Sequence, residues 1–156
     1  MTLHHGIAAA SPGVALFPRQ GAAGGSWGLE PVLDADRARR DAAARAGSHD
    51  EVPMMTLAQV VGDRRRIDLL HMDIQGGEAE LVASALPLLR ERVAFMVVGT
   101  HSRAIEGRLF DLLLGEGWRL EIERPCILQL AGAASFTSVD GVQGWRNPWL
   151  LPPDGA

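Results

Sequence analysis

The sequence predicts an α/β fold built on a mostly parallel, doubly wound sheet with an antiparallel strand at its end. Two mainly apolar runs, residues 67–73 and 93–98, have the composition of strands buried on both faces of a sheet. Each run is followed by a segment with helical periodicity, 76–92 and 105–114, and this alternation is typical of parallel sheets. Residues 118–123 alternate apolar and charged side chains instead, which indicates a half-exposed strand.

Length and composition narrow the class of protein. The chain has 156 residues, of which 47% are hydrophobic, so it is long enough for one domain that needs no disulfide or metal to stabilise its core. A net charge of -4 gives no electrostatic basis for binding nucleic acid or a membrane surface. The single cysteine, Cys126, and the absence of an apolar run of about 20 residues predict a cytoplasmic protein.

The first third of the chain has few large apolar residues. Residues 21–50 are rich in Gly, Ala and Arg and are expected to form a flexible insertion. Within them, 34–46 has helix-forming residues but no apolar stripe larger than Ala, which favours a solvated segment over a core helix. Residues 51–55 have the pattern of a short strand, and Thr56 is placed to cap a helical turn over 57–61.

The later elements follow from apolar spacing. The helix predicted over 76–92 has one apolar face, formed by Leu81, Ala85, Leu88 and Leu89. The helix over 105–114 has another, formed by Ile105, Leu109, Leu112 and Leu113, and Gly117 is expected to end it. After Pro125, residues 126–130 and 136–139 are expected to complete an antiparallel portion.

Polar residues follow both apolar strands at the edge of the sheet where ligands bind in such folds. Asp73 ends the first strand, and Gly76 and Gly77 allow a tight turn after it. Glu78 lies in the first turn of the next helix, where the helix dipole favours a carboxylate. Residues 99–103 end the second strand. Ordinary helix capping would also explain the acidic residues.

The segment "IDLLHMDIQGGEAELVASALPLL" resembles the signature of the FkbM-type S-adenosylmethionine (SAM)-dependent methyltransferases. Their pattern is a buried strand, then Lys-Ile-Asp-x-Glu/Gln-Gly-x-Glu, then a helix. His71 stands where the family usually has Lys, and the resemblance extends over residues 52–125. The matching positions are Asp68, Asp73, Gln75, Gly76 and Glu78.

The resemblance implies a partial Rossmann-like sheet of the class I methyltransferase type and transfer of a methyl group from SAM. The expected acceptor is a hydroxyl of a small molecule, such as a secondary metabolite, or of a glycan. Asp73, Glu78 and His101 are then the catalytic candidates, with the imidazole of His101 as the base. Residues expected to contact the substrate are Gln75, Gly76 and Thr100.

The cofactor site is expected to be incomplete. The segment "HHGIAAASPGVALF" resembles the strand and turn ahead of the signature, which assigns cofactor contacts to Ala8 and Ala9 as well as Asp73. The family's first two strands are missing from the sequence, so we expect one domain truncated at its N-terminus. The strand that ends at Asp73 then has a free edge, and we expect the chain to self-associate there.

Two other classes of function remain open. One is a non-catalytic half-fold that binds a partner. The other is a metal-dependent hydrolase that uses His4 or His5 with Asp73 and His101. Adjacent histidines on a strand point to opposite faces, so both cannot serve one site easily, and no metal is expected.

Overall fold

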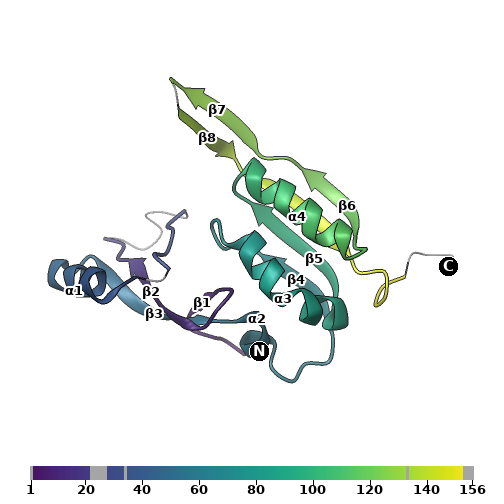
Figure 1. Ribbon diagram of the computed structural model, residues 1–156, viewed down its shortest axis with the longest axis horizontal. Helices are drawn as coiled ribbons and strands as arrows, with labels where there is room; N and C mark the ends of the chain where they lie inside the picture. The colour runs from purple at the N-terminus through teal and green to yellow at the C-terminus, as the bar shows by residue number, and fades with distance from the viewer. Residues whose placement is uncertain (1, 22–27, 34, 133, 153–156) are drawn as a thin grey trace. The chain divides into compact units, whose positions relative to one another are not determined.

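The structure is a computed structural model that describes residues 2–21, 28–33, 35–132 and 134–152. The chain divides into two compact units, Met1–Val60 and Val61–Ala156 (Figure 1). Residues 22–27 and Asp34, which belong to the predicted flexible insertion, lie outside the described residues. The single truncated domain expected from the sequence stays a prediction.

The first unit contains a three-stranded sheet in the order β1-β3-β2. Strand β3 (His49–Met55) pairs in parallel with β1 (Ile7–Ala8) and antiparallel with β2 (Gly13–Pro18). The predicted strand over 51–55 is therefore confirmed and is two residues longer. A small core forms here from Ala9, Ala15 and Met54, with Ile7 and Val52 packed against it.

Helix α1 (Arg37–Ala46) forms inside the segment that the sequence assigns to a flexible insertion. The Asp36 side chain caps it by accepting a hydrogen bond from the Arg39 N–H at 2.7 Å. Gly47 ends it with a left-handed φ of 59°. Ala43 is buried against Leu16, so this part of the insertion is an ordered helix that packs through a small side chain.

Thr56 caps α2 (Leu57–Val61), as predicted. The Gln59 N–H donates to Thr56 Oγ1 at 3.3 Å, and the Thr56 N–H donates to Gln59 Oε1 at 2.9 Å. These reciprocal bonds form a capping box, which satisfies two N–H groups that the helix itself cannot.

The second unit is built on a four-stranded mixed sheet in the order β4-β5-β9-β6. Strands β4 (Ile67–Met72) and β5 (Val93–Thr100) are parallel, and β9 (Gly141–Arg146) is antiparallel to both β5 and β6 (Arg119–Arg124). Three strands therefore run in one direction, and the antiparallel strand lies inside the sheet. The sequence predicted that residues 118–123 form an antiparallel strand at the edge. The edge position is confirmed, but β6 runs parallel to β4 and β5, because the antiparallel strand β9 lies between β5 and β6.

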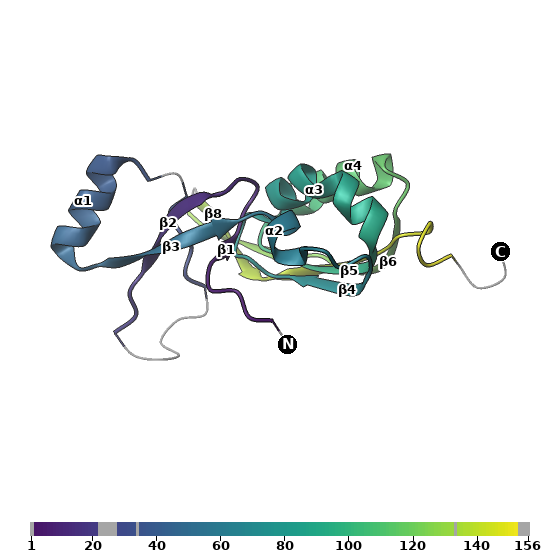
Figure 2. The ribbon, with the colours of Figure 1, turned by 90° about the horizontal axis from the view of Figure 1, so that it is seen from below.

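Helices α3 (Glu78–Arg92) and α4 (Arg103–Gly115) cover the same face of this sheet (Figure 2). The expectation of a doubly wound sheet, with helices on both faces, is therefore wrong for the described part of this unit. Both helices start and end within three residues of the predicted positions, and Gly117 follows α4 with φ of 75°. The fully buried side chains between helices and sheet include Leu81, Leu89, Met96, Leu109, Leu113 and Trp145.

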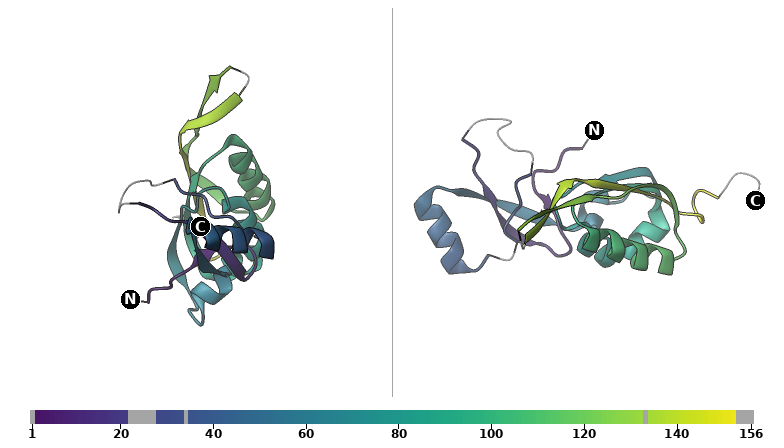
Figure 3. Two further views of the ribbon diagram at one scale, coloured as in Figure 1. Left: turned by 90° about the vertical axis from the view of Figure 1, so that its left-hand side faces the viewer. Right: turned by 90° about the horizontal axis from the view of Figure 1, so that it is seen from above.

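Strands β7 (Ile127–Ala131) and β8 (Ala134–Val139) form a separate two-stranded sheet. This hairpin extends beyond the end of α4 (Figure 3). The sequence predicted both strands as a terminal antiparallel portion, and they do pair antiparallel.

Strand β4 is an edge of the four-stranded sheet, as expected, and Leu69 on it is 60% exposed. Among the described residues, no helix is both long and apolar enough to span a membrane.

Candidate active site

The turn between β4 and α3 is held by a buried carboxylate. Gln75 and Gly76 adopt left-handed backbone conformations with φ of 58° and 111°, which reverse the chain after Asp73. Glu78 is fully buried and accepts hydrogen bonds from the N–H groups of Ile74 at 3.1 Å and Gly76 at 3.1 Å. These bonds fix the turn and satisfy the buried charge of Glu78.

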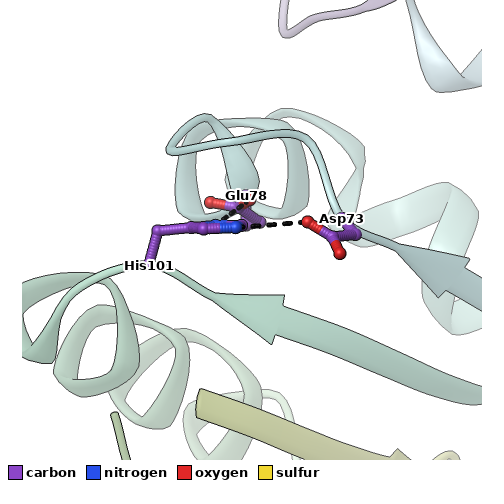
Figure 4. Close-up of side chains that lie close together, drawn as sticks. All are labelled: Asp73, Glu78 and His101. Carbon is purple, nitrogen blue, oxygen red and sulfur yellow. Dashed lines mark hydrogen bonds and ion pairs between the residues drawn. The ribbon is translucent and has the colours of Figure 1, made fainter. Parts of the chain in front are cut away.

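His101 follows the last residue of β5 and lies between two carboxylates (Figure 4). Its Nδ1 is 2.9 Å from Glu78 Oε1, and its Nε2 is 3.2 Å from Asp73 Oδ1. The carboxyl ends of neighbouring parallel strands lie at one edge of a sheet, which brings Asp73 and His101 together. The exposed fraction of the side chain rises from 0% for Glu78 to 15% for His101 and 48% for Asp73.

These exposures give the two ring nitrogens of His101 different roles. Glu78 is a buried acceptor, so the Nδ1 hydrogen bond orients the ring and favours a proton on Nδ1. Nε2 faces Asp73, the more exposed of the two carboxylates, so this side of the ring is the one nearer to solvent. A neutral ring with its proton on Nδ1 accepts a proton at Nε2, and the charged ring donates to both carboxylates. The arrangement therefore suits a proton acceptor.

A family model described as the methyltransferase FkbM domain matches residues 13–130. The chain belongs to the FkbM methyltransferase family. It is also 40% identical over 151 residues to a protein of Jannaschia sp. (strain CCS1) named "Putative methyltransferase". The alignment covers 97% of this chain and 54% of that protein, so the chain spans about half the length of this relative. No solved structure matches the chain significantly.

Two further residues of the FkbM domain shape the surroundings of Asp73. Gln75 donates from Nε2 to Asp73 Oδ1 at 3.2 Å. A Cβ atom on Gly99 would lie 3.2 Å from Asp73 Cγ, so the glycine lets the carboxylate lie against β5. The sequence predicted Gln75 and Gly76 near the substrate, and the structure places both in the turn beside Asp73.

Thr100 is turned away from this cluster. It is fully buried, and its hydroxyl donates to Glu106 Oε1 at 2.9 Å. Its predicted contact with the substrate has no support from this placement.

Ala8 and Ala9, the other predicted cofactor residues, belong to the first unit. Ala8 ends β1, and Ala9 is buried in the small core with its N–H donating to Met55 O at 2.9 Å. Their predicted cofactor contacts stay predictions.

Glu106 is a buried carboxylate that the sequence reasoning missed. It accepts hydrogen bonds from Thr100, from the Cys126 N–H at 2.7 Å and from Arg103 Nη1 at 2.7 Å. The spacing of the helix does indicate its burial. Glu106, Leu109 and Leu113 follow an i, i+3, i+7 spacing and so lie on the helix face that packs against the core.

Cys126 is buried beside Glu106. Burial raises the pKa of the Cys126 thiol, and the Glu106 carboxylate raises it further. The raised pKa keeps this thiol in its neutral form, which is a poor nucleophile.

The ligand atoms of Asp73, Glu78 and His101 lie within 4.8 Å of one another, a spacing that a metal ion accepts. Each ring nitrogen of His101 already has a carboxylate partner, and Glu78 also accepts from two backbone N–H groups. Hydrogen bonds therefore account for the arrangement. His4 and His5 belong to the first unit, and this cluster belongs to the second.

Proposed function

We propose that this chain carries the acceptor-activating part of a SAM-dependent O-methyltransferase. The acceptor is a hydroxyl of a small molecule or of a glycan. Membership of the FkbM family supports methyl transfer as the reaction class. The observation that carries the proposal is the His101 ring, held between buried Glu78 and half-exposed Asp73.

In this proposal His101 takes the proton of the acceptor hydroxyl. The hydroxyl binds beside Asp73, with its hydrogen directed to Nε2. The hydroxyl oxygen would bond to the methyl carbon as the S–CH₃ bond breaks and its electron pair stays on sulfur. The hydroxyl proton would move to Nε2, while Glu78 holds Nδ1 and Asp73 stabilises the charged ring. General-base assistance of this kind contributes about 10²–10⁴-fold in rate.

The cofactor supplies, when bound, a methyl group on a positively charged sulfur. The described residues could hold part of SAM. The Asp73 carboxylate can accept hydrogen bonds from groups such as the ammonium or the ribose hydroxyls of the cofactor. The Ile74 and Gly76 N–H groups are already bonded to Glu78 and are not free for the cofactor's carboxylate. We therefore propose that this chain alone binds SAM weakly.

We also propose a more specific fold class for the second unit. The parallel β4–β5 pair joined through α3, with a late antiparallel strand beside β5, is consistent with part of a Rossmann-like class I methyltransferase sheet. The cytoplasm is the compartment we propose, because the one cysteine is buried and unpaired.

Methyl transfer from tritium-labelled SAM to hydroxyl compounds tests this function. At millimolar SAM, we expect His101→Ala to lower the initial rate at least 100-fold and Asp73→Asn about tenfold. His71→Ala is the matched control, since His71 is exposed on β4 and outside the cluster. A calorimetric titration of the same protein measures SAM affinity separately.

Two results would count against the proposal. Equal rates for wild type and His101→Ala would remove the imidazole from the reaction. No transfer by wild type at any SAM concentration would favour the non-catalytic half-fold that binds a partner.

A further inference from the structure

Glu106 is a buried carboxylate that the proposed methyl transfer does not use. Its side chain is 4% exposed, and both of its oxygens accept hydrogen bonds. Oε1 accepts from the Thr100 hydroxyl at 2.9 Å and from the Cys126 N–H at 2.7 Å, and Oε2 accepts from Arg103 Nη1 at 2.7 Å. Three segments of the second unit therefore meet at this carboxylate: the end of β5, the start of α4 and the residue before β7.

The bonds of Glu106 lie on both sides of His101 in the chain. Strand β5 pairs with β4 as far as Val98 and with β9 as far as Thr100, so within the described residues strand pairing stops before His101. The Glu106 carboxylate accepts from the Thr100 side chain, and the Glu106 backbone N–H donates to the Ser102 carbonyl oxygen at 3.1 Å. The two residues that flank His101 are therefore both bonded to Glu106.

A third contact fixes the peptide group that follows His101. The Thr137 hydroxyl on β8 donates to the His101 carbonyl oxygen at 2.7 Å. Strand β8 pairs with β7, and β7 begins directly after Cys126, whose N–H is bonded to Glu106. Glu106 thus also anchors the start of the hairpin that supplies this contact.

The position of the His101 backbone decides whether the ring reaches both carboxylates. The ring comes from the end of β5, whereas Asp73 and Glu78 lie at the end of β4 and the start of α3. The two ring contacts are at 3.2 and 2.9 Å, and hydrogen bonds of this kind span about 2.7–3.2 Å. A shift of the His101 backbone by about 1 Å would weaken both contacts, and misplacement on this scale can cost about 100-fold in rate.

We propose that Glu106 is a positioning residue for His101, which acts through the backbone on either side of the ring. Its hydrogen bonds hold the imidazole at the distance from Asp73 and Glu78 that proton transfer needs. This inference rests on the proposed function, because it takes His101 as the base of that reaction.

Proton exchange at the His101 ring tests this role without any methyl donor. In isotope-labelled protein, the Nδ1–H that is bonded to buried Glu78 gives a ring N–H signal in nuclear magnetic resonance, and His101→Ala identifies that signal by its absence. Thr100→Val removes the hydroxyl that bonds to Glu106 and keeps a side chain of similar shape. We expect its ring N–H to exchange with solvent at least about fivefold faster than in wild type. Thr100→Ser keeps a hydroxyl and should exchange within about twofold of wild type.

Glu106→Leu tests the carboxylate itself. It should speed the exchange at least as much as Thr100→Val, and the double variant should exchange no more than about twofold faster than Glu106→Leu, because the two residues share one bond. Asn147→Ala is the control for lost stability, since the Asn147 amide donates to the Val93 carbonyl oxygen at the opposite end of β5. This variant should keep the wild-type exchange rate. Melting curves verify that each variant is folded, and the Thr100 variants decide the question if Glu106→Leu is not.

The methyl-transfer assay separates positioning from binding. Thr100→Val should lower kcat about tenfold and leave KM within about twofold for the hydroxyl compound that wild type methylates, because the base is misplaced while Asp73 and its turn stay intact.

An unchanged exchange rate in Thr100→Val would overturn this inference, and so would an exchange rate that rises as much in Asn147→Ala. Both results concern the ring alone and leave the proposed methyl transfer standing. A wild type that transfers no methyl group while the exchange differences remain would overturn the proposed function and leave Glu106 as the residue that holds the His101 ring.

Discussion

Among single residues, Glu78 links local folding to the proposed chemistry. Its carboxylate binds the turn after β4 and the Nδ1 atom of His101 together. The sequence predicted that Asp73 and His101 would meet, because each follows a parallel strand. It did not predict the pairing of Glu78 with His101, since a carboxylate in a first helical turn is usually a cap.

Glu78→Gln should lower the free energy of unfolding by about 2 kcal/mol, because the amide N–H₂ group would meet a backbone N–H and leave buried donors unpaired. Urea unfolding followed by the fluorescence of the buried Trp118 and Trp145 measures this. Glu80→Gln is the control, since Glu80 makes an exposed ion pair with Arg108, and it should cost less than about 0.5 kcal/mol. Equal losses in both variants would contradict a structural role for Glu78.

Cys126 should lower the free energy of unfolding at alkaline pH. The folded protein holds the thiol proton more tightly than the unfolded chain, since the pKa of Cys126 is raised. The stability that this thiol contributes is fully present below about pH 8.5 and is lost as the pH rises through the raised pKa. Urea unfolding of wild type and Cys126→Ala between pH 7 and 10 should show a loss that is smaller in the variant. Parallel curves would contradict the shift.

Among secondary-structure elements, β9 departs most from the sequence prediction. Residues 141–146 contain Gly141, Gly144 and a buried polar residue, Gln143, so they lack the apolar run that marked β4 and β5. Their role comes from close packing against neighbours that are remote in sequence. A Cβ on Gly144 would lie 2.8 Å from Ile122 on β6, and only the fold reveals that contact.

Gly141→Ala should destabilise the protein by more than about 2 kcal/mol, because the added Cβ would overlap Glu106 Oε1 and Thr100 Oγ1 and lie 2.7 Å from the Cys126 nitrogen. Gly107→Ala in α4 is the matched control, since its Cβ meets open space. That change should stabilise the helix by about 0.5–1 kcal/mol. Thermal unfolding of both variants measures the difference, and a neutral Gly141→Ala would contradict the packing.

At the scale of the whole molecule, the sequence identified the family but predicted only part of the arrangement of helices and strands. The signature around Asp73 identified FkbM membership, which the family model confirms. Helices on both faces were expected from general rules for α/β sheets, yet α3 and α4 cover one face. The three parallel strands β4, β5 and β6 follow one another across the sheet in one direction. Successive right-handed crossovers between them therefore place both helices on the same side.

The free edge of β4 supports the prediction of self-association. Leu69 is exposed there, and β4 has no partner on its outer side among the described residues. Light scattering between about 5 and 500 µM should show a mass that rises with concentration, and Leu69→Lys should weaken that rise. A constant monomer mass for wild type would contradict it.

The position of β9 also bears on how the protein is made. The strand that joins β5 to β6 is the last of the sheet to be synthesised. Until residues 141–146 leave the ribosome, β5 has no neighbour on that side and β6 cannot join the sheet. Assembly of the four-stranded sheet must therefore wait until β9 has been translated, and β5 has an open edge during that interval.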